Sequence, residues 1–425
     1  MQNNKMIKVM ALALVLNSFC FAGQWDVVGE MPLPVSGGQA LVLDSLIYIL
    51  GGASDSLAPV NWIQVYNPAN NQWQMAGQMS WPRYGFVADR LNDSLIVLCG
   101  GIWQNTLSSL KVELWNYKSM TPDRNLDLTN DMNFNRIYFT GHVYENSLYL
   151  FGGLMAPFWA DSSNLSFIVR YDIYSAMVSP LQEAVYSNVF LPYHHMSVRL
   201  GSVVYLIGGV HYNLSDKVMK YDLQTNLLEP AGTIHGVRAG GQAVTDGIRI
   251  YIIGGYNEGE RALNRVEYYD PVNNVSTIGP ALNYPREEEM VVVYGQNIYV
   301  FGGKGSNGAN VQWIEKLDLP TAVYGSYEEM DDHQQIRLHD NYPNPFNSTT
   351  LISFDLYHSS RVVLDIYSIS GQHIKTLAQN SFGAGSYKFY WDGRDENQAF
   401  VASGVYIYQI RTENFSQSRK MMLIR

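Results

Sequence analysis

The chain has 425 residues, of which 47% are hydrophobic and 16% are charged, so it is long enough for two or three domains and has the composition of a globular protein. Its formal net charge of −10 argues against nucleic acid as a partner, because phosphate contacts need clustered cations. Its 30 tyrosines and 36 glycines fit many short strands and turns.

Residues 1–22 have the pattern of a secretory signal peptide. Lys5 and Lys8 precede an apolar stretch over residues 9–16, and a small-residue site ends at Ala22. The apolar stretch is too short to span a membrane, so we expect a secreted or cell-surface protein with no transmembrane segment. Cleavage would remove Cys20 and leave Cys99, so we expect no disulfide within the mature chain.

Six short apolar and aromatic runs, spread between residues 47 and 303, each end in a pair of glycines. The spacing between successive pairs stays close to the period of about 50 residues that is typical of kelch arrays. The pairs are Gly51 and Gly52, Gly100 and Gly101, Gly152 and Gly153, Gly208 and Gly209, Gly254 and Gly255, and Gly302 and Gly303.

The repeat extends beyond its glycines. Unbroken apolar strands such as residues 47–50 and 298–301 suit sheets that are covered on both faces. About fifteen residues after the first glycine comes an aromatic or apolar residue followed by Asp or Asn, as at Tyr66 and Tyr269. Cys99 ends the second run, where the other runs carry Leu, Phe or Ile. We therefore expect a small buried hydrophobe there rather than a nucleophile.

On these motifs, residues 23–319 resemble a kelch β-propeller, which implies an all-β fold of six blades. The N-terminus is expected to complete the sixth blade. Residues 73–79 form an outer strand with Trp, Gly and Met at fixed spacing, residues 25–31 repeat that spacing, and no tryptophan follows Leu319 where the sixth repeat needs one. Closure of this kind would leave only short, protected sheet edges.

After residue 319 the pattern changes. Residues 320–338 contain an acidic run and read as an exposed linker. Residues 339–425 alternate strand-like segments with Asx and glycine turns, which predicts a small Ig-like antiparallel β-sandwich.

Four motifs within residues 339–425 are similar to the C-terminal sorting domain (Por domain) of proteins exported by the bacterial type IX secretion system. They lie at residues 341–347, 391–394, 402–406 and 420–425. The resemblance implies export across both membranes of a Gram-negative type bacterium, with the type IX secretion machinery as a partner. An Ig-like spacer is the alternative. The sorting-motif residues are Asn341, Pro343, Asn344, Pro345, Phe346, Asn347 and Gly404.

Four arginines recur 16 or 17 residues before the first glycine of a pair: Arg83, Arg136, Arg238 and Arg286. We expect them at a channel mouth, where guanidinium groups could clamp a carboxylate or sulfate bidentately. Pairing with acids or carbonyls of neighbouring blades is the alternative. The other candidate ligand-binding residues are His142, His194 and Glu287.

Two enzyme families offer comparisons. Tyr193, His194 and His195 are similar to the copper ligands of the galactose oxidases. However, those enzymes need a cysteine crosslinked to a ligand tyrosine, and adjacent histidines on a strand point to opposite faces. Residues 286–289, Arg-Glu-Glu-Glu, resemble the arginines and acids of the sialic-acid mutarotases and could supply an anion clamp with a general base. A solvated charge run is the alternative, and no metal or cofactor is expected.

Fold does not settle function, because propellers host several classes of activity. The first hypothesis is a monomeric, non-catalytic binding module that presents loops to a glycan or protein ligand at the cell surface. The second is a carbohydrate-active enzyme of the mutarotase or oxidase type. The third is a structural component of the cell envelope.

Overall fold

The computed structural model divides the chain into two compact units, residues 1–321 and 322–425. The predicted signal peptide and most of the predicted linker lie outside the described residues. These are 23–56, 58–102, 111–127, 136–155, 168–175, 177–182, 191–319, 336–339, 341, 344–347, 349–356, 360–369, 371–382, 385–397, 399–412 and 416–424.

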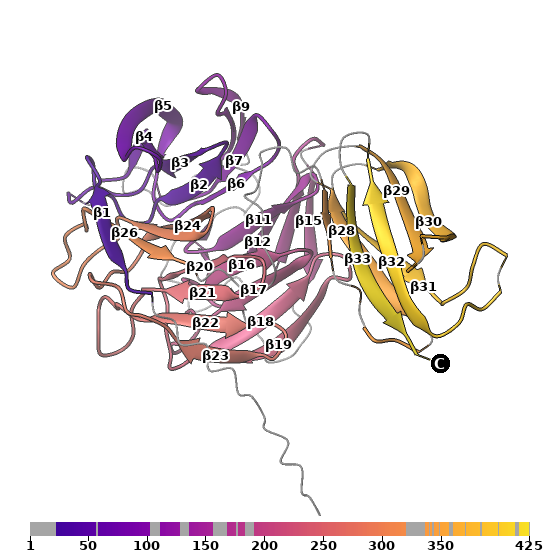
Figure 1. Ribbon diagram of the computed structural model, residues 1–425. Helices are drawn as coiled ribbons and strands as arrows, with labels where there is room; N and C mark the ends of the chain where they lie inside the picture. The colour runs from indigo at the N-terminus through magenta and orange to yellow at the C-terminus, as the bar shows by residue number, and fades with distance from the viewer. Residues whose placement is uncertain are drawn as a thin grey trace, which may run out of the picture. The chain divides into compact units, whose positions relative to one another are not determined.

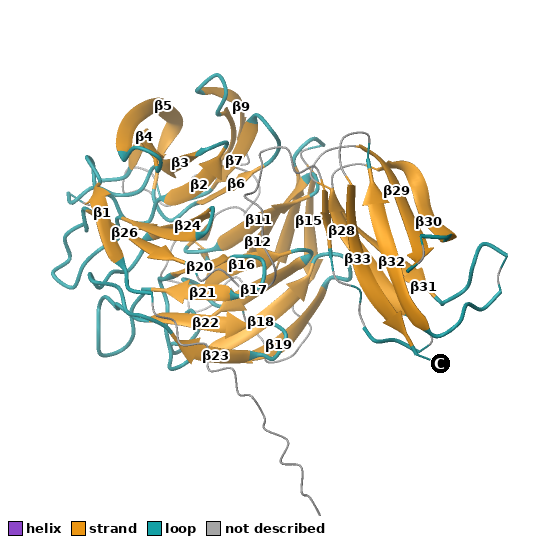
Figure 2. Cartoon of the chain, in the orientation of Figure 1, coloured by secondary structure: helices purple, strands orange, loops and turns teal. Residues whose placement is uncertain are grey.

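Every regular element among these residues is a β-strand (Figures 1 and 2). The first unit contains six four-stranded antiparallel sheets in its described part. The strands of the first three sheets are β2 (Gln39–Leu43), β3 (Leu46–Leu50), β4 (Val60–Asn67) and β5 (Gln72–Arg83); β6 (Val87–Arg90), β7 (Leu95–Cys99), β8 (Lys111–Asn116) and β9 (Thr121–Asp127); β11 (Thr140–Tyr144), β12 (Ser147–Phe151), β14 (Ile168–Asp172) and β15 (Met177–Gln182).

The remaining sheets continue the series, and a short pair, β10 (Arg136–Ile137) with β13 (Leu154–Met155), accompanies the third sheet. Their strands are β16 (Met196–Leu200), β17 (Val203–Ile207), β18 (Lys217–Asp222) and β19 (Leu227–Thr233); β20 (Gln242–Thr245), β21 (Ile250–Ile253), β22 (Val266–Asp270) and β23 (Val275–Ile278); β24 (Met290–Tyr294), β25 (Asn297–Phe301), β26 (Trp313–Asp318) and β1 (Asp26–Glu30).

The second strand of each sheet is the unbroken apolar run seen in the sequence, and it is buried because apolar clusters lie between adjacent sheets. Six such clusters each combine side chains of two sheets. One of them packs Ile47 of the first sheet with Phe301 of the sixth. Cys99 is 1% exposed within another, and burial raises the pKa of its thiol to about 12. The prediction of a buried hydrophobe is confirmed.

The N-terminal strand lies where the sequence placed it. β1 pairs antiparallel with β26 and becomes the outer strand of the sixth sheet. Trp25 is 1% exposed, and its indole N–H donates to the carbonyl of Pro280 at 2.9 Å. The pairing is therefore confirmed, and it joins the two ends of the repeat region within one sheet.

The glycine pairs are joints between consecutive repeats. In the first, third, fourth and fifth pairs, the amide of the second glycine donates to the carbonyl of the residue four positions before the first strand of the next sheet, as from Gly52 to Arg83 at 2.8 Å. The same bond runs from Gly303 back to Val35 at 2.9 Å, from the last sheet to the first. β2 likewise contacts both β6 and β24.

The described residues of the second unit form two sheets around one apolar core. Phe346, Trp391 and Tyr408 lie in this core. One sheet contains β27 (Ile336–Leu338), β28 (Thr350–Leu356) and β31 (Gly385–Trp391); the other contains β30 (His373–Phe382), β29 (Ser360–Ser368), β32 (Gly404–Arg411) and β33 (Ser416–Leu423). Nowhere in the described part of the chain does a helix have the length and apolarity that a membrane crossing requires.

Replacing Gly302 by Ala should destabilise the first unit far more than replacing Gly295 by Ala. Both glycines have a φ of 57°, so each alanine incurs the left-handed cost of about 1–2 kcal/mol. At Gly302 the new Cβ would also lie 2.1 Å from the carbonyl oxygen of Val35, whereas no atom lies within 4 Å at Gly295. Urea denaturation followed by tryptophan fluorescence measures both losses. Equal losses would contradict the close-contact explanation.

Candidate functional site

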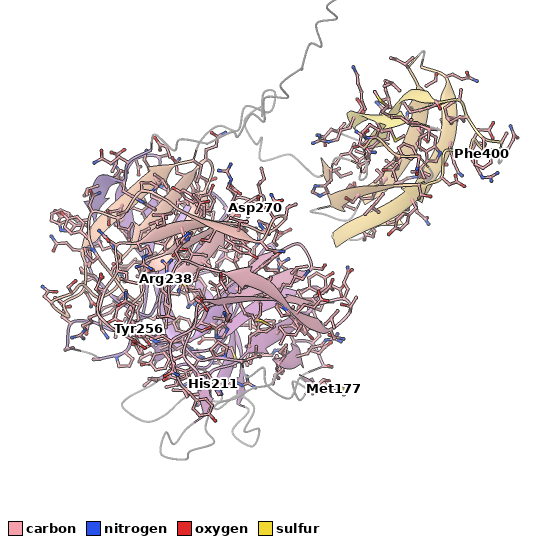
Figure 3. The ribbon with its side chains drawn as sticks, turned by 90° about the horizontal axis from the view of Figure 1, so that it is seen from below. Met177, His211, Arg238, Tyr256, Asp270 and Phe400 are labelled. Carbon is pink, nitrogen blue, oxygen red and sulfur yellow. The ribbon has the colours of Figure 1, made fainter. Side chains whose placement is uncertain are left out.

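Each sheet of the first unit is preceded by four residues that we call its leading segment: residues 35–38, 83–86, 136–139, 192–195, 238–241 and 286–289. The four candidate arginines open four of these segments. All four side chains are buried, with 0% exposure. Figure 3 shows Arg238 between Tyr256 and His211 on one side of the unit and Asp270 on the other.

Arg286 shows what the buried arginines contact. Its guanidinium donates to the carbonyls of Gly302 at 3.0 Å and Trp313 at 3.2 Å, and to the carboxylate of Glu315 at 2.5 Å. Glu315 in turn accepts from the amide of Asn283 at 2.6 Å. The arginine therefore ties the leading segment to the second and third strands of its own sheet.

The other arginines make related contacts. Arg238 pairs with Glu267, and Arg83 lies 3.7 Å from Glu113. Arg136 donates to the carbonyl of Gly152 at 2.8 Å. We expected these guanidinium groups at a channel mouth, but their burial leaves no exposed donor for an anion. The contacts agree with the alternative, pairing with acids and carbonyls, although within the same sheet rather than with a neighbour.

The third residue of every leading segment has a left-handed backbone, with φ between 52° and 65°. Three segments place glycine there, while the other three place Tyr138, His194 and Glu288. A side chain in this conformation costs of order 1–3 kcal/mol, and such strain concentrates at binding and catalytic sites. The three strained residues therefore mark a candidate site.

Backbone hydrogen bonds bring these segments side by side. The amide of His194 donates to the carbonyl of Tyr138 at 2.7 Å, and the amide of Glu288 donates to that of Gly240 at 2.7 Å. The amide of Gly37 donates to the carbonyl of Glu288 at 2.8 Å, which joins the first segment to the last. Positions more than a hundred residues apart in sequence thus meet at one end of the first strands.

Glu288 is the centre of the site. Its carboxylate is 8% exposed and accepts a hydrogen bond from the hydroxyl of Tyr84. His194 Nε2 lies 3.5 Å from Oε1, and Lys304 Nζ lies 3.3 Å from Oε2. Burial raises the pKa of Glu288, but the hydrogen bonds and charges of His194, Lys304 and Tyr84 outweigh burial and lower it to about 2. Glu288 is therefore an ionised internal anchor.

Aromatic rings surround this anchor. The ring of Tyr138 packs against that of His194 at an interplanar angle of 43°, with centroids 4.2 Å apart, and its centroid lies 6.2 Å from that of Tyr84. His194 Nδ1 lies 3.1 Å from the hydroxyl of Tyr256. Burial raises the pKa of Tyr84, Tyr138 and Tyr256, so their hydroxyls stay protonated at neutral pH. We call this set the mouth cluster: Tyr84, Tyr138, His194, Tyr256, Glu287, Glu288 and Lys304.

Glu287 differs from Glu288 in its exposure and its partner. Its side chain is 13% exposed, and its Oε1 lies 3.5 Å from Nε of Arg261, which is 60% exposed. Burial, followed by the charge of Glu288, raises the pKa of Glu287. Glu287 is thus a carboxylate held near the surface by a weak, solvent-screened ion pair.

Glu289 belongs to the charged run that the sequence analysis singled out, but its environment differs from the expected one. It is 0% exposed, and neither carboxylate oxygen has a hydrogen-bond partner of acceptable geometry. Burial raises its pKa to about 8, against the opposing effects of backbone amides and of Arg286 and Arg238. Glu289 is the fourth residue of its leading segment, and two other segments have Phe86 and Phe139 at that position. A carboxyl group therefore stands here in place of a buried phenyl ring. Residues 286–289 are therefore neither a solvated charge run nor one exposed clamp.

The candidate histidines have separate environments. His142 Nε2 lies 2.7 Å from Ser197 Oγ, and burial lowers its pKa to about 3. His195 Nε2 lies 2.8 Å from Thr140 Oγ1, and burial lowers its pKa to about 4. Both are neutral rings in polar pairs between β11 and β16, whereas His194 belongs to the mouth cluster. Among the described residues, no group of three or more His, Cys, Asp or Glu side chains could hold a metal ion.

In the second unit, the predicted sorting motif contacts the end of the chain. The amide of Phe346 donates to the carbonyl of Met422 at 2.9 Å, and the amide of Ile424 donates back to Phe346 at 2.8 Å. Asn344 Oδ1 accepts from the amide of Met422 at 2.9 Å. Asn341 is 4% exposed, while Pro345, Asn347 and Gly404 are at least partly exposed. Pro343 lies outside the described residues.

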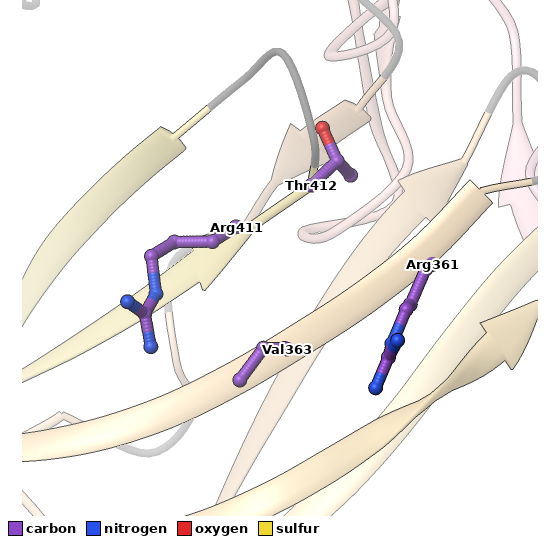
Figure 4. Close-up of a pocket in the computed structure, with 4 residues that line it drawn as sticks. All are labelled: Arg361, Val363, Arg411 and Thr412. Carbon is purple, nitrogen blue, oxygen red and sulfur yellow. The ribbon is translucent and has the colours of Figure 1, made fainter.

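This unit also has a shallow pocket, lined by Arg361, Val363, Arg411 and Thr412 (Figure 4). Val363 and Arg411 are paired residues of β29 and β32. The guanidinium of Arg411 is 2.5 Å from Asp365 Oδ2, and Asp365 also accepts from Thr376 at 2.6 Å. Arg411 therefore takes part in a network on the sheet rather than pointing freely into the pocket.

Comparisons with known proteins agree with the repeats. The kelch motif family matches residues 34–80 and 238–283. The chain carries kelch repeats. It is 27% identical over 270 residues to Kelch-like protein 36 of Bos taurus, covering 58% of this chain and 40% of that protein. It is 24% identical over 255 residues to Spermatocyte protein spe-26 of Caenorhabditis elegans, covering 59% and 35%.

Alpha-scruin of Limulus polyphemus is 26% identical over 194 residues, which cover 44% of this chain and 20% of that protein. The chain thus spans 40% or less of the length of each of these three relatives. The FlgD Ig-like domain family matches residues 341–415 of the second unit. Kelch repeats and an Ig-like domain match are therefore established, and the resemblance to a sorting domain stays a prediction.

Replacing Glu289 by Gln should flatten the pH dependence of stability. With a folded pKa near 8 and an unfolded value of about 4.3, the folded state keeps a proton that the unfolded state releases. Stability then falls as the pH rises between these values, by up to about 1.4 kcal/mol per unit. Urea denaturation at pH 5 and pH 7.5 measures this fall. Glu258→Gln, at an exposed loop residue, is the control, and parallel profiles for Glu289→Gln and the unaltered chain would exclude the assignment.

Proposed function

We propose that the kelch repeats form a closed six-bladed propeller. Three contacts between the first and last repeats support closure: the pairing of β1 with β26, the bond from Gly303 to Val35, and the bond from Gly37 to Glu288. The apolar cluster that contains Ile47 and Phe301 supports it further. In a closed ring the six leading segments surround one mouth of the axial channel.

This propeller acts as a protein-binding module. Kelch repeats generally serve as protein-interaction modules, and the relatives of this chain carry them. The observation that carries the proposal is the placement of Tyr138, His194 and Glu288 at left-handed positions that other repeats fill with glycine. Backbone strain retained in three repeats and united in one cluster is typical of a binding surface. A glycan ligand, a carbohydrate-active enzyme and an envelope component stay as predictions.

The second unit directs export to the cell surface or medium. This part of the proposal depends on the sequence motifs of residues 339–425, on the secretory pattern of residues 1–22, and on the docking of Asn344 and Phe346 against residues 420–424. The motif and the tail form one structural element through these bonds. A receptor in the export machinery could therefore recognise both together.

A photo-crosslinking amino acid should capture a protein partner when it replaces Tyr212 but not when it replaces Val272. Both side chains are highly exposed, at 81% and 84%. The ring of Tyr212 contacts that of His211, which lies on the side of Tyr256, whereas the amide of Val272 donates to Asp270, which lies on the opposite side (Figure 3). Irradiation on intact cells, followed by mass spectrometry of the adducts, is the measurement. Equal capture from both positions would indicate non-specific contact and count against the binding face.

A chain that ends at Leu319 should accumulate in the periplasm of a host with type IX secretion, while the full chain appears at the surface or in the medium. The reason is that the truncation removes the whole second unit and leaves the pairing of β1 with β26 intact. Fractionation with immunoblotting measures both proteins. Surface appearance of the truncated chain in the same amount would rule out the sorting role.

A further inference from the structure

We propose that the mouth cluster binds a primary ammonium group, a lysine side chain or an N-terminal amine of the protein partner, with Glu287 as its counter-ion. This inference rests on the proposed binding function and specifies its chemistry. The sequence suggested an anion as the ligand, because four arginines recur at equivalent positions; the structure shows these arginines to be buried. The cluster that the fold assembles offers the opposite charge.

Glu287 is the acceptor that a ligand can reach. Glu288 beside it is already engaged by Tyr84, His194 and Lys304. Glu287, by contrast, holds one solvent-exposed guanidinium at 3.5 Å. An ion pair whose guanidinium is exposed to solvent contributes little stability, so an incoming cation can replace Arg261 at small cost. The position of Glu287 itself is fixed, because its backbone exchanges two hydrogen bonds with Lys304, at 2.9 and 2.7 Å.

The tyrosine side chains of the mouth cluster are suited to binding an ammonium group. An –NH₃⁺ group has three donors and no acceptor, so it needs several oxygen acceptors in one place. Tyr138 and Tyr256 both contact His194, with ring centroids 4.2 Å apart for Tyr138 and the hydroxyl of Tyr256 3.1 Å from Nδ1. His194 in turn lies 3.5 Å from Glu288, the neighbour of Glu287 in sequence. Phenol oxygens accept hydrogen bonds, and aromatic faces attract cations.

The protein already contains one example of this recognition. The ammonium group of Lys304 lies 3.3 Å from Glu288 and 5.4 Å from the ring centroid of Tyr84. Its side chain is 13% exposed, so a partly desolvated ammonium is accommodated between a carboxylate and a tyrosine face. Glu287, Tyr138 and Tyr256 offer the same kinds of group and are less buried than Glu288 and Tyr84.

The charge around the site also favours a cation. The loop that carries Arg261 contains Glu258 and Glu260, both exposed. Glu287 adds a further negative charge, whereas Glu288 is paired with Lys304 and Glu289 keeps its proton. The summed field of these groups attracts basic segments and raises their rate of encounter, an effect that falls with ionic strength.

The test titrates the full chain with four short peptides and follows binding by NMR. The first peptide has an acetylated N-terminus and one central lysine, the second carries acetyl-lysine instead, the third carries arginine, and the fourth has a free N-terminus and no lysine. We expect the first or the fourth to bind, the second not to bind, and arginine to bind more weakly than lysine. Binding of the second peptide as tight as that of the first would overturn the proposal, as would preference for arginine.

Two variants with opposite expected effects make the test specific. Glu287→Gln should weaken binding of the ammonium peptide about tenfold or more, since it removes a charge-assisted contact. Arg261→Ala should strengthen binding, because it removes the internal competitor. Asp123→Asn and Lys217→Ala, at exposed positions elsewhere, change the net charge equally and should alter the affinity less than twofold. Unchanged binding by Glu287→Gln would overturn the proposal.

The peptide titration and the crosslinking experiment test the ammonium site and the partner-binding function separately. Capture of a partner from position 212 without any affinity for ammonium peptides would refute the ammonium site and leave the binding function standing. Affinity for ammonium peptides that depends on Glu287, without capture of a partner, would support the site and count against the partner face. Circular dichroism of each variant checks that the fold is retained.

Discussion

The first unit depends on a close backbone contact between consecutive repeats. The second glycine of a pair donates to the carbonyl that opens the next leading segment, and the first glycine approaches the same carbonyl so closely that a Cβ would lie 2.3 Å from it at Gly208 and 2.1 Å at Gly302. Only a residue without a side chain permits this approach with a positive φ. The apolar clusters between sheets can form because the backbones meet at these joints.

A second set of contacts holds in place the four leading segments that begin with arginine. Arg83, Arg238 and Arg286 reach the end of the second strand and a glutamate on the third. A buried pair of this kind is weak evidence of net stabilisation, but loss of one partner leaves an uncompensated charge and costs about 3–5 kcal/mol. The arginines therefore fix the geometry of the segments, and the residues two positions further on can carry function.

The repeats are equivalent in backbone but not in chemistry. At the left-handed position, three repeats use glycine and three use Tyr138, His194 and Glu288. At the next position, two repeats use phenylalanine where the sixth has Glu289. The departures gather in the third, fourth and sixth repeats, and they supply the central residues of the mouth cluster. A regular scaffold thus holds an asymmetric cluster of acidic, aromatic and basic side chains, of which Glu287, Tyr138, His194 and Tyr256 are partly exposed.

The sequence by itself determined the features that are encoded within a single repeat or by comparison of one repeat with another. The spacing of the glycine pairs, the buried second strands, the burial of Cys99 and the pairing of the N-terminal strand followed from patterns within about fifty residues. The direction of the arginines did not, because it depends on glutamates of the third strand such as Glu315. The mouth cluster did not either, since Tyr84, His194 and Glu288 meet only when separate repeats are brought together. The run at residues 286–289 shows the limit most clearly: four adjacent charged residues have different environments, because tertiary packing decides which side chains face the core, the neighbouring repeat or the solvent.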